Sequence, residues 1–112
     1  MTGFITIDGK ETGVTANAAT PIFYRQLYKE DFLLQTQKME EVSAETFGRM
    51  AFVMITQYDA GGDMEEIEKR LTKKAYMQWL ASLDDPMAIE YSAAAIADFY
   101  FKNQIATARP KE

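Results

Sequence analysis

The feature that most constrains the fold is a run of apolar residues at helical spacing in the middle of the chain. Large apolar side chains recur every three or four positions, at Phe47, Met50, Ala51, Met54, Ile55 and Tyr58. This period places them along one side of a helix, where they need a surface to pack against. Ser43, just before the run, is a typical helix N-cap. We therefore expect a helix that Ser43 caps and that forms the central element of the core.

Cap signals predict two short helices before this central one. Thr20 followed by Pro21 is typical of a helix start, because threonine can accept from free amide groups and proline presets φ at the first helical position. The apolar stripe that follows covers residues 21–29. Asp31 is expected to cap a second short helix that runs to Met39.

Three further helices are expected after the central one. The segment 59–63, Asp-Ala-Gly-Gly-Asp, interrupts the pattern because paired glycines make a helix costly to continue. Asp63 and Thr72 are typical of the next two helix starts, and the acidic pair before Pro86 of the last, which should end near Asn103. Met64, Ile67 and Leu71 share one face of the first of these helices. The inward face of the second is predicted to be Tyr76, Trp79, Leu80 and Leu83, and Ile89, Ala93, Ile96 and Tyr100 line the last.

The N-terminal residues favour a β-hairpin. Residues 3–7 are rich in β-branched and aromatic side chains, Asp8-Gly9 is a strong two-residue turn, and residues 10–14 can return as the partner strand. Because two strands alone are marginally stable in water, this hairpin must lie on the helices or pair with another chain.

Together these signals predict a mainly α fold, a small helical domain of about five helices with a short N-terminal β-hairpin. At 112 residues and 47% hydrophobic, the chain suits one domain with one core. We expect that domain to cover residues 1–105, with the hairpin in 3–15 and the helices in 20–104. Residues 106–112 are expected to form a flexible tail.

The composition argues against an enzyme. The chain contains no histidine and no cysteine, which removes the commonest general base, the thiol nucleophile and the preferred ligands of zinc and copper. Adjacent carboxylates occur at 40–41, 65–66 and 84–85, but neighbours on a helix diverge by about 100° and do not converge on a substrate. We therefore expect no catalytic residues, no cofactor-binding residues and no cofactor.

A calcium loop at Asp59, Gly61 and Asp63 also fails on its spacing. An EF-hand needs glycine at its sixth position and a bidentate glutamate at its twelfth, where this sequence has Met64 and Arg70. We expect no metal ligands here.

Charge and hydropathy exclude two further classes of partner. Twelve basic residues against seventeen acidic ones give a net charge of −5, which disfavours nucleic acid. The only local basic cluster, Lys69, Arg70, Lys73 and Lys74, follows three glutamates that cancel most of its field. The longest apolar run has six residues, far too few to span a membrane. The first residues, Met-Thr-Gly-Phe-Ile, lack the charged start of a secretory signal, so none is expected. A cytoplasmic location is expected.

Some apolar side chains exceed what one small core can cover. Consecutive large apolar residues on a helix cannot all face the same core, so part of such a run is expected at a protein interface, although local packing remains the alternative. The residues concerned are Phe32, Leu33, Leu34, Phe99 and Phe101.

The order of short motifs along nearly the whole chain resembles a known family. The motifs are Ile-Asp-Gly-Lys-Glu at 7–11, Thr-Pro-Ile-Phe-Tyr-Arg at 20–25, Asp31-Phe32, the long helix around Ala51, Gln78-Trp79-Leu80 before Asp84-Asp85, Tyr100-Phe101-Lys102-Asn103, Thr107 and Pro110-Lys111. With the total length, this layout resembles the small tail assembly chaperones of long-tailed phages and prophages, particularly those of Gram-positive hosts.

The resemblance implies a non-enzymatic cytoplasmic chaperone that binds the tape-measure protein, keeps it soluble and helps recruit tail-tube subunits. It also implies self-association, absence from the finished virion, and a minor longer form made by ribosomal frameshifting near the end of the gene. Two alternatives remain open: a structural adaptor that stays in the virion as a head–tail or tail component, and a small prophage regulator that binds a host factor.

Overall fold

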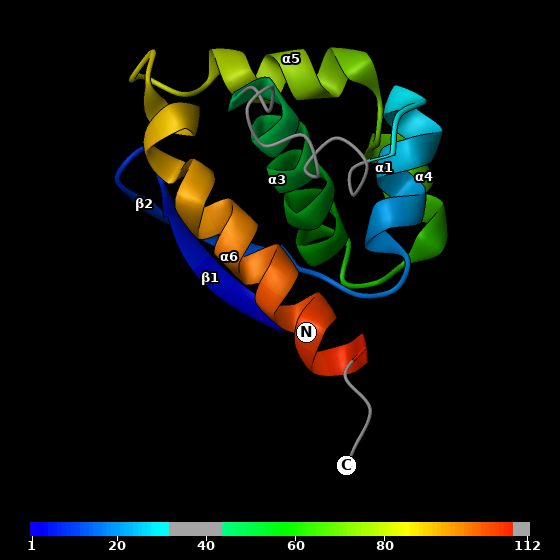
Figure 1. Cartoon of the computed structure of the whole chain (residues 1–112). Coiled ribbons are helices and arrows are strands. Elements are labelled where there is room, and N and C mark those ends of the chain that lie inside the picture. Colours follow the sequence, from blue (N-terminus) through cyan, green and yellow to red (C-terminus); the bar gives the residue numbers. More distant parts are fainter. Residues whose placement is uncertain (32–43, 109–112) are drawn as a thin grey trace.

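The computed structural model describes residues 1–31 and 44–108, with side chains described as far as 102. The two strands are β1 (Thr2–Ile7) and β2 (Lys10–Thr15), and the helices are α1 (Thr20–Tyr28), α3 (Ala44–Asp59), α4 (Met64–Arg70), α5 (Lys73–Ala81) and α6 (Ala88–Ala108). Figure 1 shows α3 inside a frame of the other helices, with the hairpin behind α6. The predicted mainly α fold with an N-terminal hairpin is confirmed for this part of the chain.

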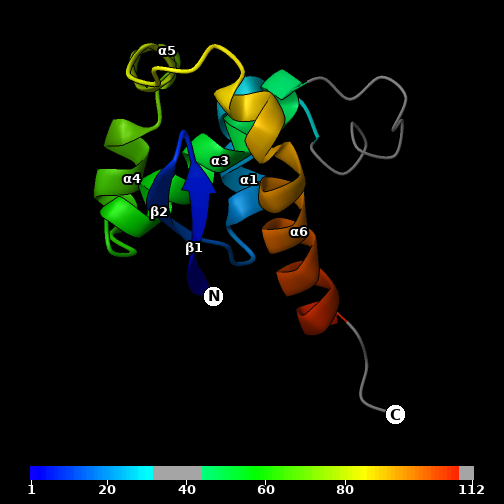
Figure 2. The same ribbon diagram turned by 90° about the vertical axis from the view of Figure 1, so that its left-hand side faces the viewer.

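The hairpin forms as the sequence predicts. The strands β1 and β2 pair antiparallel from Thr2–Thr15 to Ile7–Lys10. Asp8 and Gly9 both have positive φ, of 55° and 73°, as a type I′ turn requires. Ile5, Ile7 and Val14 on the inward face of the hairpin are buried, and Figure 2 shows the hairpin lying in front of the helices. Packing on the helices therefore stabilises this two-stranded sheet.

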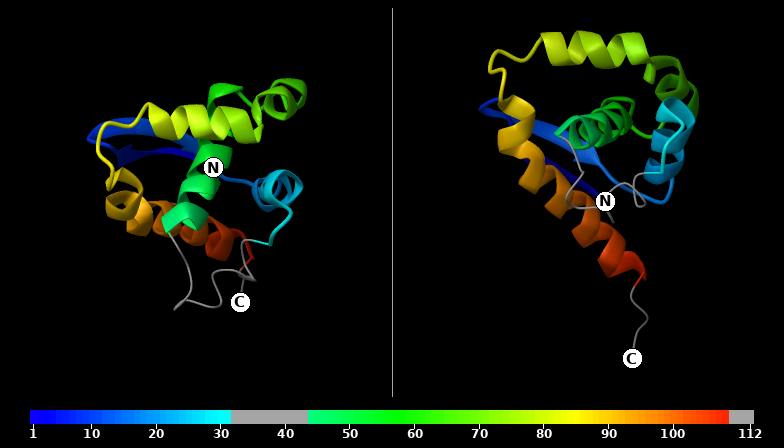
Figure 3. Two further views of the ribbon diagram at one scale, coloured as in Figure 1. Left: turned by 90° about the horizontal axis from the view of Figure 1, so that it is seen from above. Right: turned by 45° about the horizontal axis from the view of Figure 1, so that its top comes forward.

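Helix α3 is the centre of the core, as its apolar stripe predicts. Met50, Ala51 and Met54 have no exposed surface. More of α3 is buried than its apolar stripe predicts, because Phe52 and Val53 on other sides of the helix are buried as well. The views in Figure 3 show the reason: the hairpin, α1, α5 and α6 lie around α3 on different sides.

The helix starts at Thr20, Asp63 and Thr72 are confirmed, but the capping role predicted for the Thr20 hydroxyl is wrong. Asp63 accepts from the amides of Glu65 and Glu66, and Thr72 Oγ1 accepts from the amide of Ala75 at 3.0 Å. Thr20 is instead the first residue of α1, and its hydroxyl donates to Gln57 Oε1 on α3 at 2.7 Å. The hydroxyl is therefore used for a buried tertiary bond rather than for a cap.

The last helix is longer than predicted. Helix α6 runs to Ala108 instead of ending near Asn103, because Ala-Thr-Ala is compatible with a helix and the first disfavoured position is the residue before Pro110. Asp85 Oδ1 accepts from the amide of Met87 at 2.8 Å, just before the helix begins. The helix predicted to follow Asp31 and the cap predicted at Ser43 lie outside the described residues.

Candidate protein-interaction surface

Two of the five predicted interface residues can be placed. Phe99 and Phe101 on α6 are half-buried and pack against the core, with the Phe101 ring 5.3 Å from that of Tyr100. Phe32, Leu33 and Leu34 lie outside the described residues. The interface role of all five stays a prediction, while the local packing of Phe99 shapes the surface next to it.

Two strand glycines let aromatic rings lie directly on the hairpin backbone. A Cβ atom added to Gly3 would lie 2.7 Å from Cε1 of Phe99, and one added to Gly13 would overlap the ring of Tyr58. In the register, Gly3 shares a face with Val14 and Gly13 shares the opposite face with Phe4. The hairpin is therefore held between a ring from α6 on one face and a ring from α3 on the other.

A groove runs along the seam between β1 and α6. Two hollows of about 370 Å³ and 570 Å³ lie along this seam and meet at Ala95; we call them together the β1–α6 groove. On the helix side Ala88, Ser92 and Ala95 share one face, and their small side chains let the strand approach closely. Ser92 Oγ donates to the backbone oxygen of Thr6 at 3.3 Å, which fixes strand and helix side by side. Figure 2 shows β1 and α6 next to each other.

Exposed apolar side chains border this groove. The side chain of Phe4 is 57% exposed and that of Tyr91 75% exposed, one from each wall. The rings of Phe4 and Tyr58 form an edge-to-face pair, with 5.8 Å between their centroids. Large exposed rings beside a groove are typical of protein contact surfaces, because they bury much area at low conformational cost.

The outer edge of β1 adds backbone groups to the same surface. Met1 and Ala16 lie opposite each other and exchange two backbone hydrogen bonds. Hydrogen-bonded pairs alternate along an antiparallel ladder, so in this register the odd-numbered residues of β1 bond to β2. The amide and carbonyl groups of Thr2 and Phe4 consequently point away from β2, along the edge of the groove. Sequence reasoning missed this surface; its only signal was that Phe4 lies on the outward face of a predicted strand.

A second cluster of polar and aromatic groups lies between α1, α3 and α5. The Arg49 guanidinium lies 5.0 Å from the centroid of the Tyr28 ring and 3.0 Å from the Glu30 carboxylate. Burial raises the pKa of Tyr24 and of Tyr76 to about 12, and it also raises the pKa of Tyr28. These phenols stay neutral at physiological pH, so they serve as packed rings rather than as nucleophiles.

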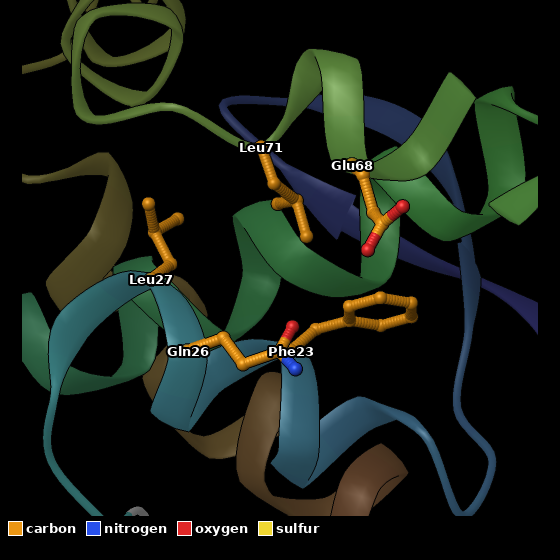
Figure 4. A pocket seen from close by; sticks show the side chains of 5 residues that line it. All are labelled: Phe23, Gln26, Leu27, Glu68 and Leu71. Carbon is orange, nitrogen blue, oxygen red and sulfur yellow. The ribbon is translucent and has the colours of Figure 1, made fainter. Parts of the chain in front are cut away.

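The hollow between α1 and α4 is small. Figure 4 shows the side chains that line it, and its volume is about 250 Å³, below the usual range of ligand pockets. It is lined by Phe23, Gln26, Leu27, Glu68 and Leu71. With one carboxylate and one amide, this hollow offers no converging set of catalytic groups.

Within residues 1–31 and 44–102, no three acidic side chains come close enough together to hold a metal ion. None of the described helices is both long enough and apolar enough to cross a membrane. No family model, curated protein or solved structure matches this chain.

Proposed function

We propose that the chain is a non-enzymatic tail assembly chaperone of a long-tailed phage or prophage. In this role it binds the tape-measure protein, keeps it soluble, and helps recruit tail-tube subunits in the host cytoplasm, without remaining in the virion. The proposal comes from the order of sequence motifs described above. The β1–α6 groove is the observation in the fold that carries it, because the groove exposes the apolar side chains of Phe4 and Tyr91 on a small acidic domain.

The groove suits a long helical client. A tape-measure protein is a long chain of largely helical segments with exposed apolar stripes, and such stripes bind in grooves lined by apolar side chains. Phe4 and Tyr91 would cover part of a stripe. The net charge of −5 would keep the complex soluble by repulsion between bound copies.

Co-expression tests this proposal. The gene is expected to be followed by an overlapping second frame and then by a very long reading frame, whose product is the expected client. We expect that product to aggregate when made alone and to be soluble and co-purified when made with this chain. The double variant Phe4→Ser/Tyr91→Ser should fold, because both side chains are largely exposed, but should capture clearly less client.

The matched control is Met77→Ser, which removes an equally exposed apolar side chain from α5, away from the groove. We expect it to capture the client like the native chain. A client that stays soluble without the chaperone, or that the Phe4/Tyr91 variant captures in full, would contradict the proposal. Detection of the chain in purified virions by mass spectrometry would favour a structural adaptor instead.

A further inference from the structure

A second groove lies on another side of α3, between α3, α4 and α5. Its apolar floor is formed by Phe52, Ile55, Ala75 and Trp79, and its volume is about 310 Å³. We call it the three-helix groove. Trp79, the only tryptophan of the chain, is half-buried there and stacks loosely on Phe52, with 6.0 Å between the ring centroids.

Part of the only local basic cluster in the sequence borders this groove. Lys69 and Arg70 from the end of α4 line it, whereas Lys73 and Lys74 are exposed at the start of α5, next to the lining residue Thr72, and do not line it. Asp59 lines the groove too, so its charge opposes theirs. Of the three charged residues that line the groove, two are basic and one is acidic, whereas the net charge of the chain is −5.

The fold also separates charges that are adjacent in the sequence. Glu68 lines the hollow between α1 and α4, on a different side of α4 from Lys69 and Arg70. Glu66 stays with the basic residues, 3.1 Å from Arg70 and 3.8 Å from Lys69, but these ion pairs are exposed. Exposed pairs contribute little, so a carboxylate of a partner can share or replace Glu66 at small cost.

We infer that the three-helix groove binds an acidic amphipathic helix of a protein partner. Its floor takes the apolar side chains of that helix, with Trp79 as the main contact, while Lys69 and Arg70 face acidic side chains beside them. A helix fits better than a strand, because α3, α4 and α5 that form this groove offer no free strand edge for backbone pairing. This site lies outside the β1–α6 groove and does not depend on the proposed chaperone function.

Trp79 provides a direct readout, since no other tryptophan contributes to the emission. Two designed peptides without tryptophan are titrated into the full chain; they share the same length and leucine face, but their polar faces carry glutamate or lysine. We expect the glutamate peptide to shift Trp79 emission to the blue and to saturate. The lysine peptide should bind at least about tenfold more weakly, because its charges face Lys69 and Arg70.

Two charge-neutralised variants locate the effect. Lys69→Gln/Arg70→Gln and, outside α4, Lys73→Gln/Lys74→Gln should each weaken the glutamate peptide by about fivefold or more. Lys10→Gln/Lys29→Gln changes the net charge equally at exposed positions elsewhere and should bind like the native chain. The Lys73/Lys74 variant tests the inference even if changes in the short helix α4 impair folding.

Three results would overturn the inference. The first is no saturable change in Trp79 emission with the glutamate peptide. The second is equal binding of both peptides, or equal loss of binding in the Lys10/Lys29 variant. The third is tighter binding of a short oligothymidylate than of the glutamate peptide, which would make the groove a nucleic-acid site instead.

Discussion

The two grooves of this protein both expose apolar side chains, but they differ in how they are built and in their charge. The β1–α6 groove lies between a strand edge and a helix, and three carboxylates and one ammonium line it: Asp8, Asp85, Asp98 and Lys102. The three-helix groove lies among helices only and carries a basic rim. Under the two proposals, apolar exposure makes each groove a contact surface, and the surrounding charge would decide which partner each one accepts.

Alkaline pH should produce the largest effect, because it destabilises the core beneath both grooves. Burial raises the pKa of Tyr24, Tyr76 and Tyr100 to about 12, above the ordinary value of 10.0 that the unfolded chain retains, and it also raises the pKa of Tyr28. The folded state therefore holds these protons more tightly. Its stability is complete below about pH 10 and falls as the pH rises toward 12, by about 1.4 kcal/mol per pH unit for each tyrosine.

Urea unfolding at pH 9 and pH 11, with tyrosinate absorbance as a second probe, measures this effect. The variant Tyr28→Phe should show a smaller loss between the two pH values, since one buried phenol no longer ionises. Equal stability of the native chain at both pH values would show that these hydroxyls are not buried in solution.

The next effect should disturb the hairpin, including Phe4 at the border of the β1–α6 groove, and leave the three-helix groove intact. In Gly13→Val the new side chain overlaps the ring of Tyr58, which must move away from the hairpin. We expect a loss of about 1–3 kcal/mol in the free energy of unfolding, typical of overpacking. Urea unfolding measures it, and Trp79 emission should not change.

The double variant Gly13→Val/Tyr58→Ala separates this clash from any other effect of valine. Because the ring is absent, valine should cost less in this background than in the native chain. If valine costs the same in both backgrounds, the Tyr58 ring does not lie on Gly13.

The smallest effect should loosen only the three-helix groove. Thr72 caps α5, so Thr72→Ala leaves the amide of Ala75 without its acceptor and should cost about 1 kcal/mol. The start of α5 should fray, which shifts Trp79 emission to the red. Thr72→Ser keeps the hydroxyl and should match the native chain in both measurements. An unchanged emission in Thr72→Ala would show that the cap does not position the groove.

Local signals were enough to predict most elements of this fold. The turn at Asp8-Gly9 and the caps at Asp63 and Thr72 form as predicted, because each depends on residues only a few positions apart. The helix start at Thr20 was also confirmed, but the cap predicted for its hydroxyl was wrong, because the hydroxyl donates to Gln57, thirty-seven residues away. No local rule reports that distant acceptor.

The surfaces were harder to predict than the elements. Among the side chains that border the β1–α6 groove, only Phe99 was selected from the sequence, as one member of an apolar run. Phe4 and Tyr91 gave no such signal, because an isolated aromatic residue is more often buried than exposed. In the sequence, the glutamates before the basic cluster cancel most of its charge. The fold separates part of that charge, because Glu68 lies on a different side of α4 from Lys69 and Arg70.

The sequence by itself determined the periodic helices, the hairpin turn, two of the caps, the acidic net charge and the absence of histidine and cysteine. Only the tertiary structure decided that α3 is buried on several sides, that the hairpin lies between the rings of Phe99 and Tyr58, and that the basic cluster borders an apolar groove with Trp79. The physical reason is the separation along the chain over which each kind of interaction acts. Hydrogen bonding and backbone preferences act over a few residues, whereas burial and the local electric field depend on every segment that packs nearby.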